Sequence, residues 1–192
     1  MTVIRDKGSH VMIDLETLGT GPDAAVVSIG ACRFNINTGE IQSRFHEKVQ
    51  FSPTMGKIDP ATVLWWFQQS EEARAALISG QRLPLIDVLK NFRHWVNNGD
   101  CEFGNVAGLW SNGPTFDETI LRHAFGRFDL HFGVSFRLSR CCRTFFMLAQ
   151  EFGIKPTPAL IKHDALDDAI AQAKTVCAVY ERISRSKTGA EL

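Results

Sequence analysis

The chain has 192 residues, the length of one domain, and 44% of them are hydrophobic, which is enough to bury a sizeable core. Its 21 lysines and arginines balance 21 aspartates and glutamates, which excludes the strong basic field that would hold a long duplex by its phosphates. The sequence has no run of eighteen apolar residues, no charged-then-apolar leader and no metal or redox spacing among its five cysteines. We therefore expect a cytoplasmic protein with reduced thiols and no membrane contact.

The first third of the chain predicts a three-stranded antiparallel meander. An apolar run over residues 11–17 is broken by Gly19-Thr20-Gly21-Pro22 and resumes over residues 25–35. An Asn-Thr-Gly turn then leads into residues 41–49, where Phe45, Glu47 and Val49 would share one face. We expect these three segments to pair in chain order.

The remainder of the chain alternates helical and strand patterns. In chain order it predicts a helix over 61–78 after an Asp59-Pro60 cap, a helix over 83–96 closed by Asn97-Asn98-Gly99, a strand over 106–110, a helix over 116–124, a weak strand over 136–141, a helix over 144–152 and an alanine-rich helix over 165–183. This order is typical of an α/β fold whose mixed sheet, an antiparallel three-strand meander plus parallel strands, is flanked by helices. It resembles the ribonuclease H-like architecture, in a single domain over 1–192 with an ordered core over about 9–183 and a flexible tail over 184–192.

Two carboxylates lie one residue apart in the first predicted strand. Alternate side chains of a strand share a face, so Asp14 and Glu16 would project together while Ile13 and Leu15 point to the opposite side. Two adjacent carboxylates repel each other unless a cation lies between them. A divalent metal ion would remove that conflict, and two such ions about 4 Å apart can clamp an in-line phosphoryl displacement.

Further polar residues in the second half of the chain could complete such a site. Asp117 follows a strand and a turn, where it could reach back over the sheet, although alone it reads more simply as a helix-start carboxylate favoured by the dipole. The same two interpretations apply to Asp168 in the first turn of the last helix. His163 precedes that helix and is either a general base for the attacking water or a solvated loop histidine. Nearby, Asp164 and Asp167 suit a helix cap and its capping-box partner.

Three motifs resemble those of the DnaQ-like, DEDDh 3′-to-5′ exonucleases. They are Asp-x-Glu-Thr at 14–17, Phe-Asp at 116–117, and a histidine at 163 followed five positions later by an aspartate, and together they span residues 11–173. The longer segments 110–117 and 162–169 are similar to the branch that contains phage exonuclease A and mycobacterial ribonuclease AS. One departure is that Asn112 lies five residues before Asp117, where many members have four, because the turn carries Gly113-Pro114.

The resemblance implies a metal-dependent enzyme that hydrolyses the 3′ end of single-stranded RNA or DNA to nucleoside 5′-monophosphates. By this resemblance the ligands of two Mg²⁺ or Mn²⁺ ions would be Asp14, Glu16, Asp117 and Asp168, and the base would be His163. It is the resemblance, and not the spacing, that selects Asp168 over its neighbouring aspartates. Related enzymes often dimerise, so a homodimer is a further expectation.

The remaining candidates would face the substrate. An aromatic ring can hold a terminal base by stacking, and adjacent helical residues point about 100° apart, so one of two neighbouring tryptophans can face a groove while the other lies in the core. Two core or rim aromatics are an equally good interpretation. The candidates near a terminal base are Trp65, Trp66 and Gln69, and by the resemblance to the family Thr17 and Leu18. Asn112 is a further candidate. Arg140 and Arg143 either bind phosphate or are solvated arginines.

Two other functions fit parts of the sequence. A catalytically silent nucleic-acid-binding module could keep the same fold, but without metal its four acids would repel phosphate. An endonuclease of the same architecture would cut within a strand and would not need a free 3′ end.

Overall fold

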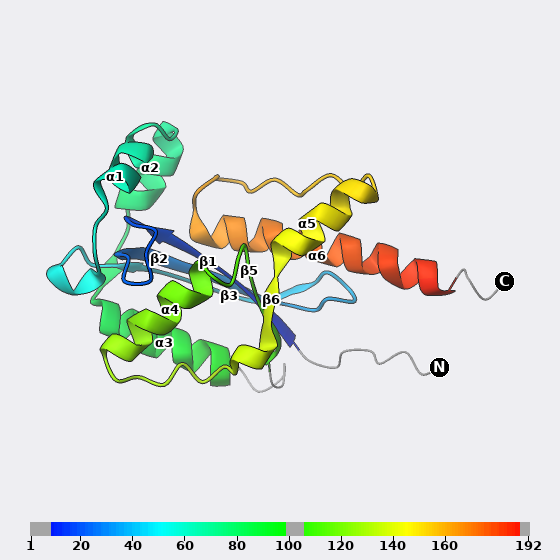
Figure 1. The fold of residues 1–192 in the computed structure, drawn as a ribbon, viewed down its shortest axis with the longest axis horizontal. Coiled ribbons are helices and arrows are strands. Elements are labelled where there is room, and N and C mark those ends of the chain that lie inside the picture. The colour runs from blue at the N-terminus through cyan, green and yellow to red at the C-terminus, as the bar shows by residue number, and fades with distance from the viewer. Residues whose placement is uncertain (1–8, 99–105, 189–192) are drawn as a thin grey trace.

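The computed structural model describes residues 9–98 and 106–188, which form a six-stranded sheet between two layers of helices (Figure 1). The strand order is β4-β3-β2-β1-β5-β6. The strands are β1 (Ser9–Thr17), β2 (Val26–Phe34), β3 (Ile41–Val49), β4 (Arg82–Leu83), β5 (Val106–Ser111) and β6 (Ser139–Cys141). The helices are α1 (Pro60–Phe67), α2 (Glu71–Ile78), α3 (Leu85–Asn98), α4 (Asp117–Arg127), α5 (Cys142–Glu151) and α6 (Ala165–Thr188), with 3-10 turns η1 (Pro53–Met55) and η3 (Phe136–Leu138).

The predicted mixed sheet is confirmed. Strands β1, β2 and β3 pair antiparallel in chain order, whereas β5 pairs parallel with β1 and β6 pairs parallel with β5. Strand β1 therefore lies between an antiparallel and a parallel neighbour. Its last parallel pair with β5 joins Ile13 to Ser111, so the carboxyl end of β1 extends beyond β5.

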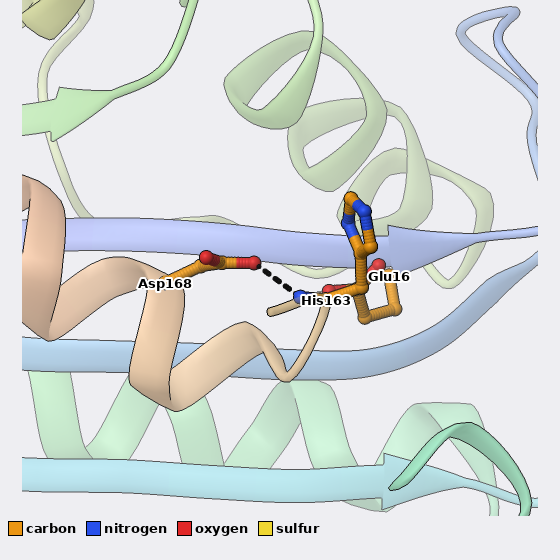
Figure 2. Close-up of side chains that lie close together, drawn as sticks. All are labelled: Glu16, His163 and Asp168. Atoms are coloured by element: carbon orange, nitrogen blue, oxygen red, sulfur yellow. Dashed lines mark hydrogen bonds between the residues drawn. The ribbon is translucent and has the colours of Figure 1, made fainter. Parts of the chain in front are cut away.

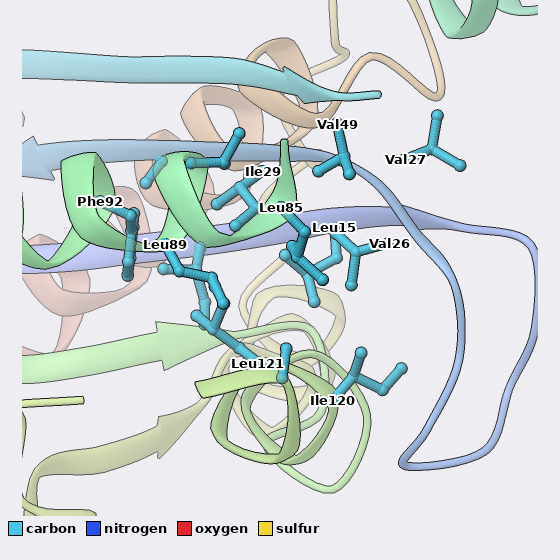
Figure 3. Close-up of a cluster of buried hydrophobic side chains, with 14 of the residues drawn as sticks. Leu15, Val26, Val27, Ile29, Val49, Leu85, Leu89, Phe92, Ile120 and Leu121 are labelled. Carbon is cyan, nitrogen blue, oxygen red and sulfur yellow. The ribbon is translucent and has the colours of Figure 1, made fainter. Parts of the chain in front are cut away.

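The side chains of β1 divide the core into two parts, as a period of two requires. Val11, Ile13 and Leu15 belong to the larger cluster, which includes apolar residues of α3 and α4 (Figure 3). Met12 belongs to the smaller cluster on the other face, with residues of α5 and α6. Helices α3 and α4 thus cover one face of the sheet and α5 and α6 the other (Figure 1).

The prediction of a single helix over residues 61–78 is wrong. Helix α1 ends at Phe67, and α2 begins at Glu71 after a cap in which the Ser70 hydroxyl accepts a hydrogen bond from the Ala73 N–H. Both helices bury residues in the same cluster, Trp66 from α1 and Leu77 from α2, so the apolar spacing continues across the break. The cap replaces the lost helical hydrogen bonds.

Other boundaries also differ from the sequence-based expectation. Residues 82–83 form a short edge strand beside β3 instead of starting a helix, and the predicted strand over 136–141 is a 3-10 turn followed by three strand residues. Residues 184–188 belong to the predicted tail but are helical, since α6 extends to Thr188. Side-chain hydrogen bonds at helical spacing join Arg185 to Glu181 and Arg182 to Ser186. Gly99 of the predicted helix end and the last residues of the predicted tail lie outside the described residues.

The start of α6 lies directly on β2. A Cβ atom on Gly30 would be 2.1 Å from the carbonyl carbon of Ala165, so only glycine permits this approach. The contact places the segment before α6, which carries His163, against the sheet. Within residues 9–98 and 106–188, no helix is long and apolar enough to cross a membrane.

Candidate metal and catalytic site

Asp14 and Glu16 project from β1 toward the α6 side of the sheet. Glu16 is 7% exposed, and Asp14 is partly exposed. The Gln172 side chain on α6 donates a 2.8 Å hydrogen bond to Asp14 Oδ1. The pair therefore lies on the face opposite Ile13 and Leu15, as the strand alternation predicts.

Asp117 reaches the same end of β1 from the first turn of α4. It is 3% exposed, and its Oδ1 accepts a hydrogen bond from the Leu15 N–H at 3.2 Å. That N–H lies beyond the last β1–β5 pair, so the side chain satisfies a donor that the sheet leaves open. The turn over residues 111–116 thus brings a carboxylate from α4 beside the two on β1.

Three aspartates at the start of α6 have different partners. Asp164 caps the helix, because its Oδ1 accepts hydrogen bonds from the N–H groups of Leu166 and Asp167. Asp167 does not complete a capping box, since its Oδ2 accepts from the Ile161 N–H. Asp168 turns toward the sheet, where its Oδ2 accepts from the His163 N–H at 2.8 Å.

Asp168 lies close to Glu16 and His163 (Figure 2). The three residues offer ligand atoms that all lie within 4.8 Å of one another, and among the described residues no other group of three His, Cys, Asp or Glu side chains meets this condition. Carboxylate oxygens are the ligands that hard divalent cations prefer. The donor set therefore fits Mg²⁺ or Mn²⁺.

The carboxyl groups of the site are crowded and poorly solvated. Burial raises the pKa of Glu16 to about 9, and the charges of Asp168 and Asp117 add to the effect. Burial likewise raises the pKa of Asp117 to about 7 and the pKa of Asp168 above its usual value. The pKa of Asp14 is raised well above its usual value by burial and by the neighbouring acids. A divalent cation would relieve this repulsion and keep the acids ionised.

His163 lies between the acids and two tryptophans. Its ring centroid is 5.0 Å from that of Trp65 and 5.9 Å from that of Trp66, both edge to face. Its backbone has φ of 64°, a left-handed conformation in which its N–H meets Asp168. Burial and the nearby Lys162 lower the pKa of the imidazole, so the ring is neutral and able to accept a proton near neutral pH.

The two tryptophans have different surroundings. Trp66 is 4% exposed and donates from Nε1 to the Thr17 carbonyl at 2.9 Å, so it belongs to the core beside the site. Trp65 is 42% exposed and lies next to His163, so it is the tryptophan that a ligand can reach. Gln69 donates to the Trp65 carbonyl. Leu18 is half-buried, and its carbonyl accepts from the Asp59 N–H at the start of α1.

The basic candidates lie on β6 and in the first turn of α5. Arg143 donates from Nε to the Asn112 Oδ1 at 3.2 Å and lies over Gly113, which has φ of 110°. Its charge offsets part of the rise that burial causes in the pKa of Asp117. Arg140 is farther along the edge of the sheet, where its Nη1 donates to the Arg137 and Ser139 carbonyls.

Gln172 is a further residue of the site that was not predicted from the sequence. It lies four residues after Asp168 on α6, which puts both side chains on one face of the helix. Its carbonyl oxygen is 3.7 Å from the Cys142 sulfur, so the amide is held between α5 and Asp14. The i, i+4 spacing from Asp168 was the signal that could have found it.

The fold and the order of these acids define a DnaQ-like nuclease of the DEDDh type. The family model described as the 3′-5′ exoribonuclease Rv2179c-like domain matches residues 9–180, and the chain belongs to that family. An exodeoxyribonuclease of enterobacteria phage T4 is 31% identical over 121 residues, which are 57% of this chain and 52% of the relative. The chain thus spans about half the length of the curated relative that it matches.

Solved structures show the same fold. The nuclease domain of 3′hExo, described as a DEDDh family member bound to rAMP, has a TM-score of 0.60 at 14% identity over 97% of this chain and 95% of its own. Exonuclease I of E. coli in complex with a dT13 oligonucleotide has a TM-score of 0.66 at 16% identity over 94% of this chain and 43% of its own. Pop2p of S. pombe in its Mg²⁺- and Mn²⁺-bound form has a TM-score of 0.60 at 12% identity over 90% of this chain and 82% of its own.

Proposed function

We propose that the protein is a metal-dependent 3′-to-5′ exonuclease that hydrolyses single-stranded ends, one phosphodiester at a time, to nucleoside 5′-monophosphates. The observation that carries the proposal is the approach of Glu16, His163 and Asp168 to within 4.8 Å at the end of β1. Asp14 on the same strand and Asp117, bonded to Leu15 N–H, complete a set of four acids and one base. Neither a silent binding module nor an ordinary helix cap needs this set.

Each residue of the set has a role that its position supports. Asp14, Glu16, Asp117 and Asp168 would hold two divalent cations. When bound, two such ions lower the pKa of the attacking water and neutralise charge on the attacking and leaving oxygens. His163, which is neutral and only partly buried, accepts the proton of that water.

The substrate is proposed from the relatives. The matched family is described as exoribonuclease over residues 9–180, which makes single-stranded RNA the first candidate. The phage T4 relative is an exodeoxyribonuclease, so single-stranded DNA is the second. Both 3′hExo, bound to rAMP, and exonuclease I, bound to dT13, support a pocket for a single-stranded end, and Pop2p supports Mg²⁺ or Mn²⁺ as the cation.

A time course on matched RNA and DNA oligonucleotides tests direction, sugar and metal together. With a label at the 5′ end and with Mg²⁺ or Mn²⁺, the proposal expects a ladder that shortens from the 3′ end and stops on addition of a chelator. A blocked 3′ end should stop degradation. Internal cuts in the blocked substrate would identify an endonuclease, and binding without any cleavage would identify a silent module.

A pair of neighbouring substitutions tests the assignment of the metal ligands. Asp168→Asn removes a carboxylate that lies beside Glu16, whereas the matched control Asp167→Asn removes one that accepts from the Ile161 N–H. We expect Asp168→Asn to abolish metal-dependent release of mononucleotides and Asp167→Asn to retain it. Equal loss in both variants would contradict the assignment.

The role of His163 needs a separate measurement. His163→Ala should slow hydrolysis far more than it weakens the binding of Mn²⁺, since a base acts on water and not on the metal. An equal loss of both would show that the imidazole is a ligand. A homodimer and a cytoplasmic location are further proposals, which light scattering and cell fractionation test.

A further inference from the structure

A row of exposed cationic and aromatic side chains runs along the outer edge of the sheet to the proposed active site. Strand β6 is the last strand on its side of the sheet. Phe136, Arg137, Arg140 and Arg143 follow one another through η3, β6 and the first turn of α5, and all four are exposed. We call these four residues the edge row.

The edge row joins the site at Arg143. That side chain lies over Gly113 and is bonded to Asn112, in the turn that leads to Asp117. Arg137 lies on the 3-10 turn η3, Arg140 on β6 and Arg143 in the first turn of α5, so the three guanidinium groups come from three consecutive elements. Successive guanidinium groups on one exposed edge can meet different phosphates of a single strand.

The arginines of the edge row have unused charge. Arg140 donates from Nη1 to two backbone carbonyls. The guanidinium carbon of Arg137 lies 6.0 Å from the centroid of the Phe136 ring. Neither arginine forms a salt bridge anywhere in residues 9–98 or 106–188. In a chain of zero net charge, two exposed and uncompensated guanidinium groups beside a proposed nuclease site suit an anionic ligand.

A pocket of about 250 Å³ lies beside Phe136. Phe136 is 71% exposed, and the pocket is also lined by Pro114 and Thr115 of the turn before Asp117. Oε1 of the buried Glu118 carboxylate on its wall accepts hydrogen bonds from Arg122 and Ser139 at 2.7 Å, so Arg122 balances its charge, whereas Oε2 has no hydrogen-bond partner among the described residues. The pocket is therefore a place where a flat ring can stack on an aromatic side chain beside an ion-paired carboxylate.

We propose that the edge row is the track for the nucleotides upstream of the 3′ end, with Arg140 and Arg137 holding successive phosphates and a base stacked on Phe136. The proposal rests on the proposed function and adds the path of the substrate to it. It predicts that the enzyme prefers longer single strands and that the preference depends on these residues. Stacking on an aromatic side chain tolerates every base, so the track selects length and not sequence.

The test compares substrates from a dinucleotide to a decanucleotide at several salt concentrations. The variants are Phe136→Ala and the double variant Arg137→Ala/Arg140→Ala. The matched control is Lys90→Ala/Arg93→Ala, which removes two cationic residues that line another pocket. Both lie on α3, and this helix packs beside β3 on the far half of the sheet. Phe136, Arg137, Arg140 and Lys90 are exposed and Arg93 is partly exposed, so thermal unfolding should confirm that each variant is folded.

Both track variants should hydrolyse the dinucleotide at the wild-type kcat/KM and lose the advantage of the decanucleotide. Phe136→Ala should weaken binding of the decanucleotide by about 5- to 150-fold. The double arginine variant should lower the slope of log affinity against log salt by about 1.4, since each single-strand phosphate contact contributes about 0.7. The α3 control should change neither quantity.

Three outcomes would overturn the track. A double variant with the wild-type salt slope and length preference would show that the strand does not follow β6. An equal loss on the dinucleotide would place the residues in the site itself, and a loss confined to the α3 control would place the strand on the other half of the sheet. If the wild type released no mononucleotide at all, the proposed function would fail separately, and fluorescence anisotropy with the same oligonucleotides would still measure the track.

Discussion

Gln172, which lies on α6 one helical turn beyond Asp168, donates a 2.8 Å hydrogen bond to Asp14. The bond fixes one oxygen of a carboxylate that is a proposed cation ligand. Because the amide also contacts the Cys142 sulfur, its orientation is held from the opposite side. Residues that orient a ligand in this way typically change metal affinity by about 10- to 100-fold when they are replaced.

Gln172→Leu should therefore raise the metal concentration needed for half-maximal activity by about 10- to 100-fold. At saturating metal, kcat should recover much of its wild-type value. A metal titration of mononucleotide release measures this, with Lys174→Ala as a control at an exposed position of the same helix. Loss of activity that no metal concentration restores would show that the amide acts on the substrate.

The crowded acids also predict how stability depends on pH. The pKa values of Glu16 and Asp117 are raised in the folded state, to about 9 and about 7, from about 4 in the unfolded chain. Raised acids stabilise the fold fully below their unfolded pKa, and that contribution is lost as pH rises through the folded values. In chelator, the Tm should thus fall between about pH 4 and about pH 9.

Two additions to the same experiment identify the cause. Mn²⁺ should raise the Tm more at alkaline than at acidic pH, because it binds the ionised acids. Glu16→Gln should be more stable than the wild type in chelator at alkaline pH, since it carries no charge there. A Tm in chelator that is independent of pH in this interval would contradict the arrangement of the acids.

Trp65 and Trp66 should respond differently to substitution. Trp66→Ala removes a buried ring and its bond to the Thr17 carbonyl, so it should lower the free energy of unfolding by about 3–5 kcal/mol. Trp65→Ala should leave that free energy nearly unchanged and weaken binding of the 3′ nucleotide by about 5- to 150-fold. Denaturant titration and KM values separate the two, and Trp65→Phe should restore binding. A large loss of stability in Trp65→Ala would mean that its ring is part of the core.

Two glycine substitutions test the approach of α6 to the sheet. Gly30→Ala places a Cβ 2.1 Å from the Ala165 backbone, so the start of α6 must move, and both Tm and nuclease activity should fall sharply. Gly126→Ala on α4 meets no atom within 4 Å and should be neutral or stabilise by up to about 1 kcal/mol. Equal behaviour of the two variants would contradict the close packing of α6 on β2.

The part of the site that the sequence could predict is the part set by local periodicity. Asp14 and Glu16 share a face because strand side chains alternate, and this holds in any fold that makes β1 a strand. The three aspartates at 164, 167 and 168 could not be told apart in this way, because all of them lie within about one turn of α6. Their separate partners come from the cap and from the sheet below the helix.

Tertiary contacts account for most of the other differences. The apolar spacing over 61–78 does not show the break at Ser70, because both halves pack into one core. The local signal of a new helix was Ser70 followed by two glutamates. The two residues of β4 pair with β3 only after α2 has turned the chain back. The bond from Trp66 to the Thr17 carbonyl likewise depends on where α1 docks.

The site draws its residues from three elements that are far apart in the chain. Asp14 and Glu16 lie on β1, Asp117 begins α4, and His163 and Asp168 flank the start of α6, which follows all the other helices and strands. A folding intermediate in which the sheet has formed but α6 has not docked would hold two or three acids and no base. Recovery of nuclease activity during refolding should therefore report the docking of α6 and not the formation of the sheet.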